Sequence, residues 1–377
     1  MPASAPAARL MIGASESAAD LLYATRFLAP DPFFWIEHQG RTLAGFTALE
    51  VDRARATASV DRVLSIARLH QTLRQQLGRS PSFAEIALVH LRKLRIRHVQ
   101  VPGWTDAASL RTLESNRLRV TVIQGPFFPE RETKSPEEIR AITQALRAAE
   151  IGLARAFDIL RQATIRPRRP LLWNGRTLTS EILRGEIDAA VIRAGAVPSG
   201  TIVAGGAQAC DPHERGSGPL RPHQTIILDI FPRSLRTGYF GDLTRTVVKG
   251  RASESLRHLW HTVAEGKRWA LSQIRPGASG QTIHDALLHR FKQAGYPTVK
   301  KAGRWTGFFH GTGHGLGLEI HETPRFSDTR FPPGLAITVE PGLYDPALGG
   351  VRLEDLVIVT PRGCRNLTRA PEFIEIP

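Results

Sequence analysis

The sequence predicts an α/β protein (α+β) in which a small N-terminal domain precedes a larger C-terminal one. Helix-like and strand-like patterns alternate through residues 15–130, which is typical of an α/β layer domain. A segment of prolines and charged residues at 125–140 then interrupts that pattern. Because 377 residues also suit two domains, we expect a boundary near residue 133, with domains at 1–133 and 134–377.

The N-terminal elements follow from local periodicity. Residues 31–46 predict two strands around a Gln-Gly turn, and residues 59–78 predict a helix that ends at a glycine. A second helix over 82–96 leads into the short strand HVQVPG, and LRVTVIQG at 118–125 predicts another strand.

The C-terminal domain begins with a clear helix start. Ser135 can cap the helix, Pro136 suits its first turn, and Glu138 completes a capping box. The pattern predicts further helices and places strands at 200–250 and from 305 to the end; the expected helices are 135–163, 178–195, 253–275 and 280–295.

Composition excludes several classes of protein. The balance of 50 Lys and Arg against 35 Asp and Glu gives a charge of +15, but the basic residues are scattered and no aromatic residues are interleaved with them. We therefore expect no specific nucleic-acid partner. No segment has eighteen uninterrupted apolar residues, which argues against a membrane span. The two cysteines predict no disulfide framework, and the N-terminus resembles no secretory signal, so we expect a cytoplasmic protein.

Four carboxylates lie within or beside apolar, strand-like segments, where burying a charged group is energetically unfavourable. Asp229 interrupts the apolar run TIILDIF, and Asp242 directly precedes the β-branched run LTRTVV. Glu340 ends the strand-like LAITVE, and Glu354 lies within VRLEDLVIVT. Each pair is joined by a hairpin-like connection, so the sequence predicts that the four acids gather on one surface. An ion pair could explain any one of them, but all four together indicate a metal site.

The stretch HGTGHGLGLEIHE, residues 310–322, supplies histidine to that surface. It is too rich in glycine for a stable helix, and we expect a strand in which His314, Leu316, Leu318 and Ile320 share one face. One histidine among four carboxylates suits two divalent ions of the Mn²⁺, Fe²⁺, Co²⁺ or Zn²⁺ type better than one structural zinc. Arg352 is expected on the same strand face as Glu354.

Four of these segments resemble the sequential motifs of the pita-bread metallopeptidases, the family of methionine aminopeptidase, Xaa-Pro aminopeptidase and prolidase. They are LDIFPRSLRTGYFGDLTRT, HGTGHGLGLEIHE, TVEPGLY and VRLEDLVIVT. The resemblance covers residue 134 to the end. Residues 31–54 are similar to the N-terminal domain of the Xaa-Pro aminopeptidase and prolidase branch. Together, the two resemblances imply a creatinase/prolidase-type α/β domain followed by a pita-bread domain.

The resemblance also implies site roles. It makes Asp229 a ligand of one metal, His314 and Glu340 ligands of the other, and Asp242 and Glu354 bridging ligands. It places His213 and His321 at the scissile carbonyl, matches His310 with the residue that opens the histidine motif, and places Arg325 near the substrate carboxylate. We also expect His310 and Arg352 to contact the substrate. The family motif usually has Gly soon after the first Asp, whereas this chain has Ile230-Phe231-Pro232 and a slightly longer hairpin.

The function implied is hydrolysis of the peptide bond before proline by a hydroxide that two metal ions, Mn²⁺ first among them, activate. Glu340 is expected to carry the proton. Proline-containing peptides or dipeptides are the expected partners, and a homodimer the expected assembly. Two alternatives stay open: an enzyme of this fold with altered chemistry, such as another C–N hydrolase or a lyase, and a non-enzymatic basic binding protein on the same scaffold.

Overall fold

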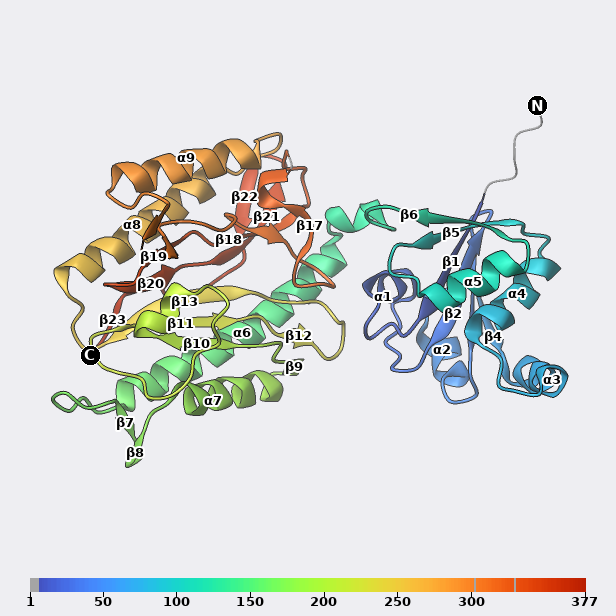
Figure 1. Ribbon diagram of the computed structural model, residues 1–377, viewed down its shortest axis with the longest axis horizontal. Helices are drawn as coiled ribbons and strands as arrows, with labels where there is room; N and C mark the ends of the chain where they lie inside the picture. The colour runs from blue at the N-terminus through green and yellow to red at the C-terminus, as the bar shows by residue number, and fades with distance from the viewer. Residues whose placement is uncertain (1–6, 302, 329) are drawn as a thin grey trace. The chain divides into compact units, whose positions relative to one another are not determined.

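The computed structural model describes residues 7–301, 303–328 and 330–377 (Figure 1). The first six residues, part of the N-terminal segment considered above as a targeting signal, lie outside the described residues. The chain divides into two compact units, Met1–Arg131 and Glu132–Pro377.

Unit 1 is built on one six-stranded mixed sheet with the strand order β4-β3-β2-β1-β5-β6. Its strands are β1 (Ala8–Gly13), β2 (Phe33–His38), β3 (Arg41–Phe46), β4 (Arg62–Ser65), β5 (His98–Pro102) and β6 (Arg119–Ile123). Its helices are α1 (Ala19–Thr25), α2 (Val51–Thr57), α3 (Ala67–Leu77), α4 (Phe83–Lys93) and α5 (Ala107–Ser115).

Side-chain alternation along the strands gives this sheet two buried faces. In β2, Phe34 and Ile36 join one apolar cluster, whereas Phe33 and Trp35 join another on the opposite face. The helices cover both faces, so unit 1 is the expected α/β layer structure.

The predicted hairpin at 31–46 is confirmed as β2 and β3, but the helix predicted from residue 59 is wrong at its start. Residues 62–65 instead form β4, which pairs in parallel with β3, and the helix begins only at Ala67. Edge pairing with a distant strand overrides the local helical periodicity here.

The four predicted helices of unit 2 are confirmed as α6 (Pro136–Gln162), α7 (Ser180–Arg193), α8 (Glu254–Gln273) and α9 (Gly280–Gln293). The Ser135 side chain accepts the N–H of Glu138 and the Glu138 carboxylate accepts the N–H of Ser135, which is the predicted capping box.

The two larger sheets of unit 2 have the orders β10-β11-β13-β23 and β17-β16-β18-β21-β22. The first contains β10 (Ile202–Gly205), β11 (Thr225–Ile230), β13 (Leu243–Lys249) and β23 (Glu375–Ile376). The second contains β16 (His314–Gly315), β17 (Glu322–Arg325), β18 (Ala336–Val339), β21 (Asp355–Thr360) and β22 (Gly363–Asn366). The two-stranded pairs are β7 (Leu172–Trp173) with β8 (Arg176–Thr177), β9 (Ala196–Val197) with β12 (Arg233–Ser234), β14 (Val299–Lys301) with β15 (Arg304–Thr306), and β19 (Gly342–Asp345) with β20 (Gly349–Arg352).

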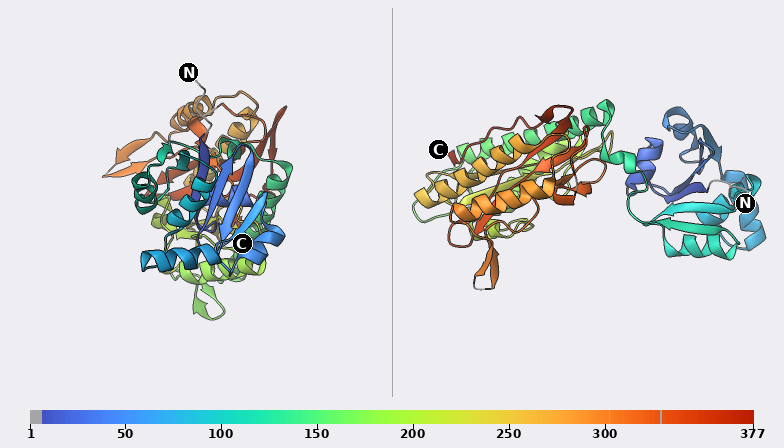
Figure 2. Two further views of the ribbon diagram at one scale, coloured as in Figure 1. Left: turned by 90° about the vertical axis from the view of Figure 1, so that its right-hand side faces the viewer. Right: turned by 90° about the horizontal axis from the view of Figure 1, so that it is seen from above.

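Helices cover the sheets of unit 2 on two sides, with α8 and α9 on one side and α6 and α7 on the other (Figure 1), and the right-hand view of Figure 2 shows α8 and α9 from above. Helix α6 packs against β11 and β13, and α8 packs against β18, β19 and β20. The core between α8, α9 and the sheets is a large apolar cluster that includes Trp260, Phe291, Phe308 and Val357. This rigid support holds the strand ends on which the predicted acids lie.

Within the described residues, no helix combines the length and the apolar character that crossing a membrane requires.

Candidate metal centre

Strand pairing brings the four predicted carboxylates together. Strands β11 and β13 are antiparallel, with Asp229 opposite Thr244, and Asp242 directly precedes β13. Strands β18 and β21 are also antiparallel, so Glu340, which follows β18, lies beside Glu354, which precedes β21. The Glu354 N–H donates to the Thr244 carbonyl at 3.0 Å and joins the two sheets at this point.

Three side chains form a compact donor set. Asp242, His314 and Glu354 each offer one ligand atom, and these atoms lie within 4.8 Å of one another. The His314 Nε2 atom is 3.6 Å from Asp242 Oδ2 and 3.3 Å from Glu340 Oε1. Glu340 therefore borders the same space as the other three.

Burial and mutual repulsion perturb these acids strongly. Asp242 is 4% exposed and Glu354 is 2% exposed. Burial, followed by the neighbouring carboxylates, raises the pKa of each well above its ordinary value. Burial also raises the pKa of Glu340, to about 7, although the Arg352 guanidinium opposes the shift.

The donor set fits a divalent cation. Glu354 Oε2 accepts the Thr244 hydroxyl at 2.8 Å, but the buried Oε1 has no hydrogen-bond partner in the described structure. A buried acceptor without a partner is costly, and crowded buried carboxylates repel one another. A cation bound between Asp242, His314 and Glu354 would remove both penalties, and oxygen donors with one imidazole suit Mn²⁺, Fe²⁺, Co²⁺ and Zn²⁺.

Asp229 takes part in the cluster but is held by arginine. Its Oδ2 accepts Arg352 Nη2 at 2.6 Å, and Arg352 Nη1 donates to the Tyr344 hydroxyl at 3.1 Å. The Asp229 charge nevertheless contributes to the raised pKa values of Asp242, Glu340 and Glu354. Arg352, which was expected at the substrate, is buried against Asp229. It ends β20, whereas Glu354 lies between β20 and β21, so the two residues do not share one strand as predicted.

The glycine-rich stretch differs from the predicted strand. Only His314 and Gly315 form β16, and the following residues bend back toward Glu322. A Cβ on Gly313 would lie 2.0 Å from the Thr338 carbonyl oxygen, and one on Gly317 would lie 2.6 Å from the Glu322 carboxylate. The glycines are required because the chain packs directly on its neighbours, so the stretch cannot continue as a regular strand.

Glu322 organises this bend. Its Oε1 accepts the N–H groups of Leu318 and Glu319 at 2.7 and 3.2 Å, and its Oε2 accepts the Lys134 ammonium at 2.7 Å. The Lys134 and Glu322 side chains are only 3% and 4% exposed. The segment between His314 and His321 is therefore held by a buried ion pair.

Three further predicted histidines surround the donor set. The rings of His314 and His321 lie 4.4 Å apart at nearly a right angle, and His310 Nε2 is 2.8 Å from the Tyr344 hydroxyl. Burial lowers the pKa of His310 to about 3 and that of His321 to about 4, so both rings are neutral near pH 7. His213 is exposed, and its charge contributes to the pKa shifts of His310, His321 and Glu340. Arg325 is exposed at the end of β17.

Sequence reasoning missed several supporting residues. The Thr244 hydroxyl donates to Glu354, and the Thr338 hydroxyl donates to Glu340. The Tyr344 hydroxyl accepts Arg352, which in turn binds Asp229. All three lie within or beside the segments that carry the acids, so adjacency was an available signal. Lys134 and Glu322 are far apart in the sequence, and nothing local indicates that they pair.

Comparisons with known proteins identify the family and the fold. The model of metallopeptidase family M24 matches residues 140–361, more than half of the chain. The Xaa-Pro dipeptidase of Pyrococcus furiosus is 35% identical over 173 residues, which cover 45% of this chain and 47% of that protein. The chain thus spans about half the length of that curated relative.

Solved structures match over almost the whole chain. The X-Pro aminopeptidase from Thermotoga maritima MSB8 has a TM-score of 0.82 at 22% identity, with 98% of this chain and 97% of that chain covered. The prolidase from Pyrococcus furiosus has a TM-score of 0.77 at 22% identity, with 97% of each chain covered. The fold of unit 2 is accordingly the pita-bread fold. The chain belongs to metallopeptidase family M24.

Proposed function

We propose that the protein is a metal-dependent exopeptidase that hydrolyses the peptide bond preceding proline. The observation that carries the proposal is the buried set of Asp242, His314 and Glu354, whose donor atoms lie within 4.8 Å of one another in a chain of a metallopeptidase family. The similarity to a protein named Xaa-Pro dipeptidase supports the choice of substrate.

Asp229, Asp242, His314, Glu340 and Glu354 would hold two divalent ions, with Asp242 and Glu354 between them. When bound, the ions supply Lewis-acid activation of water and of the scissile carbonyl. Mn²⁺ is our first choice because the set has four carboxylates and one imidazole, and hard oxygen donors favour that ion.

Glu340 is the proposed proton carrier. Its carboxylate oxygen lies 3.3 Å from His314 Nε2, at the edge of the donor set, where it can accept a proton from water and release it again. It would take the proton of the attacking water and deliver it to the proline nitrogen, which leaves as a basic secondary amine. Its partner Thr338, 3.3 Å away, would keep the carboxylate in one orientation.

The histidines are proposed to stabilise charge on the carbonyl oxygen. His321 is neutral near pH 7 and adjoins His314, so it can donate an N–H to a developing oxyanion. His213 is proposed to donate a second N–H to the same oxyanion. His310 and Arg325 are proposed to contact the substrate, with Arg325 near its carboxylate. For Arg352, the contacts with Asp229 and Tyr344 support positioning of a metal ligand in place of direct substrate contact.

Three wider expectations remain proposals. We propose that residues 1–133 form the creatinase/prolidase-like domain and residues 134–377 the catalytic domain. A homodimer, inferred from the family resemblance, and a cytoplasmic location are also proposed, and light scattering and cell fractionation test them.

The direct test is mass-spectrometric detection of the cleavage products. These are free proline from Xaa-Pro dipeptides, and the released first residue with a shortened peptide that begins with proline from longer Xaa-Pro peptides. Metal-stripped protein is compared with the same protein after Mn²⁺ is added back, and Asp242→Asn is carried through both conditions. Mn²⁺-dependent release that Asp242→Asn abolishes supports the proposal. Release from dipeptides alone makes the enzyme a dipeptidase, whereas cleavage of the longer peptides makes it an aminopeptidase.

Absence of cleavage by protein that demonstrably binds Mn²⁺ would reject the Xaa-Pro activity. The specific reason to expect another reaction would then be the variant hairpin after Asp229, where β12 pairs with β9 and Phe240 donates its N–H to the Gly317 carbonyl beside the histidine-bearing bend.

A further inference from the structure

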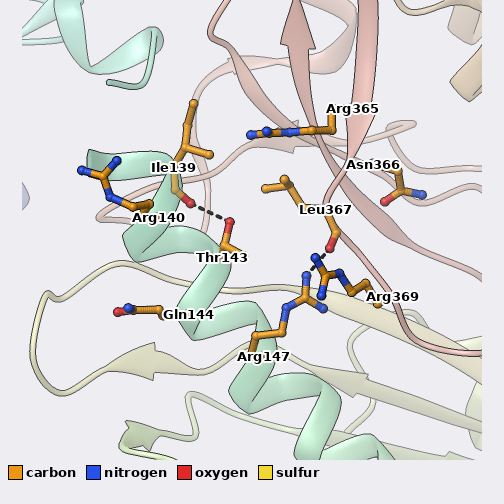
Figure 3. Close-up of a pocket in the computed structure, with 9 residues that line it drawn as sticks. All are labelled: Ile139, Arg140, Thr143, Gln144, Arg147, Arg365, Asn366, Leu367 and Arg369. Atoms are coloured by element: carbon orange, nitrogen blue, oxygen red, sulfur yellow. Dashed lines mark hydrogen bonds between the residues drawn. The ribbon is translucent and has the colours of Figure 1, made fainter. Parts of the chain in front are cut away.

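A second pocket in unit 2 is lined by arginines and shares no residue with the candidate metal centre. It lies between the N-terminal half of α6 and the segment formed by β22 and the residues after it, with a volume of about 410 Å³ (Figure 3). Its walls carry four arginines, and two apolar side chains contribute to its lining: Arg140, Arg147, Arg365, Arg369, Ile139 and Leu367. We call this cavity the arginine pocket.

The positive charge of the arginine pocket is only partly balanced. Arg140 pairs with Glu137 at 2.6 Å, and Arg147 pairs with Glu150. Among the residues that the structure describes, the Arg365 and Arg369 side chains have no hydrogen bond or ion pair. Two guanidinium groups therefore stand at the cavity without a compensating acid, and an anion in the cavity would be attracted to both.

Parts of the arginine pocket are fixed before any ligand binds. Arg147 donates to the Leu367 carbonyl as well as to Glu150, and the backbone N–H of Arg369 donates to the other Glu150 oxygen at 2.6 Å. One carboxylate thus ties α6 to the segment after β22. Figure 3 shows Arg365, Arg147 and Arg369 around the Leu367 side chain.

The shape and chemistry select a phosphate group. Guanidinium groups bind phosphate oxygens through paired N–H donors, and several guanidiniums from different directions suit a tetrahedral anion better than a planar carboxylate. Leu367 is buried and Ile139 is half-buried, whereas the Arg140, Arg365 and Arg369 side chains are exposed, so an anion reaches these guanidinium groups directly from solvent. None of the described residues that line the cavity is aromatic, so it offers no platform for base stacking and nucleic acid is a poorer fit.

We propose that the arginine pocket binds the phosphate group of a small molecule, either inorganic phosphate or a phosphate monoester. The site does not depend on the proposed peptidase activity, since none of its residues belongs to the candidate metal centre.

Isothermal titration of metal-stripped protein with inorganic phosphate, glycerol phosphate and succinate, at constant ionic strength, tests the proposal. Saturable binding of a phosphate ligand is expected, with succinate at least about tenfold weaker because it is planar at each carboxylate. The tighter of the two phosphate ligands identifies the source of the phosphate group.

Two variants localise the binding. Arg365→Gln/Arg369→Gln should weaken phosphate binding by at least about tenfold, because it removes both uncompensated guanidiniums. Arg193→Gln/Arg268→Gln, which removes two exposed arginines on α7 and α8, causes the same change in net charge and should leave the affinity within about twofold, since distant exposed charges are screened.

Three outcomes would overturn the proposal. They are no saturable binding, equal affinity for succinate, and equal weakening in the two double variants.

Discussion

At the residue scale, the candidate metal centre costs stability when no metal is bound. The pKa of Glu340 is raised from 4.5 to about 7, so the folded metal-stripped protein binds more protons than the unfolded chain in that interval. A carboxyl with a raised pKa stabilises the fold below its unfolded value and loses that contribution as pH rises through its folded value. We therefore expect the free energy of unfolding of metal-stripped protein to fall between about pH 4.5 and pH 7.

Urea unfolding at several pH values measures this effect. Glu340→Gln should make the pH dependence shallower, because the amide does not titrate, and saturating Mn²⁺ should remove most of the loss by neutralising the cluster. A metal-stripped wild-type protein that becomes more stable over this interval, with Glu340→Gln unchanged in slope, would contradict the explanation.

The ion pair between Lys134 and Glu322 makes a second prediction at this scale. Lys134→Met leaves a carboxylate buried without its cation, which costs about 3–5 kcal/mol of unfolding free energy. Because Glu322 also holds the bend before His321, Mn²⁺ affinity should fall with stability. Arg161→Met is the control: it breaks the exposed pair with Asp158 and should cost less than about 1 kcal/mol. Equal stability losses in the two variants would argue against a structural role for the buried pair.

At the scale of elements, close packing of α6 on the start of β13 fixes Asp242. A Cβ added to Gly241 would lie 2.2 Å from the Leu146 backbone nitrogen in α6, so Gly241→Ala must displace either the helix or the strand. We expect Gly241→Ala to lower the unfolding free energy by about 1–3 kcal/mol and to weaken Mn²⁺ binding, since Asp242 is the next residue.

Gly185→Ala is the matched control. Gly185 lies in α7, and a Cβ there has no neighbour within 4 Å. Alanine at that position should stabilise the helix by up to about 1 kcal/mol without changing metal affinity. Calorimetric Tm values and Mn²⁺ titration distinguish the two variants; a Gly241→Ala protein with wild-type affinity would show that the contact does not position Asp242.

Elements with strong local signals could be predicted from the sequence, and those set by distant contacts could not. The α6 start at Ser135 and Pro136 was predicted because a capping box is local. The strand predicted through His314 to Ile320 was wrong after Gly315, because Glu322 and Lys134 bend the chain through contacts that alternation does not encode. The pairing of Arg352 with Asp229 was missed for the same reason, since it joins two sheets.

At the scale of the whole molecule, the fold class and family could be predicted because acids within apolar strands are rare, and here four such acids and one histidine occur in the order of the family motifs. The candidate ligands also indicate which unit carries the metal site. All five candidate metal ligands lie in Glu132–Pro377, as does the region matched by the family model, whereas unit 1 has its own sheet and two apolar clusters.

A final prediction follows from this division. The fragment of residues 132–377 should fold alone and bind Mn²⁺ with an affinity within about threefold of the full chain, because a compact unit with its own core retains its strand positions. Circular dichroism checks folding, and Mn²⁺ titration monitored by electron paramagnetic resonance checks the site. The same fragment carrying Asp242→Asn should fold but bind weakly. A wild-type fragment with full helical content and no Mn²⁺ binding would show that residues before 132 contribute to the metal site, which the ligand positions do not predict.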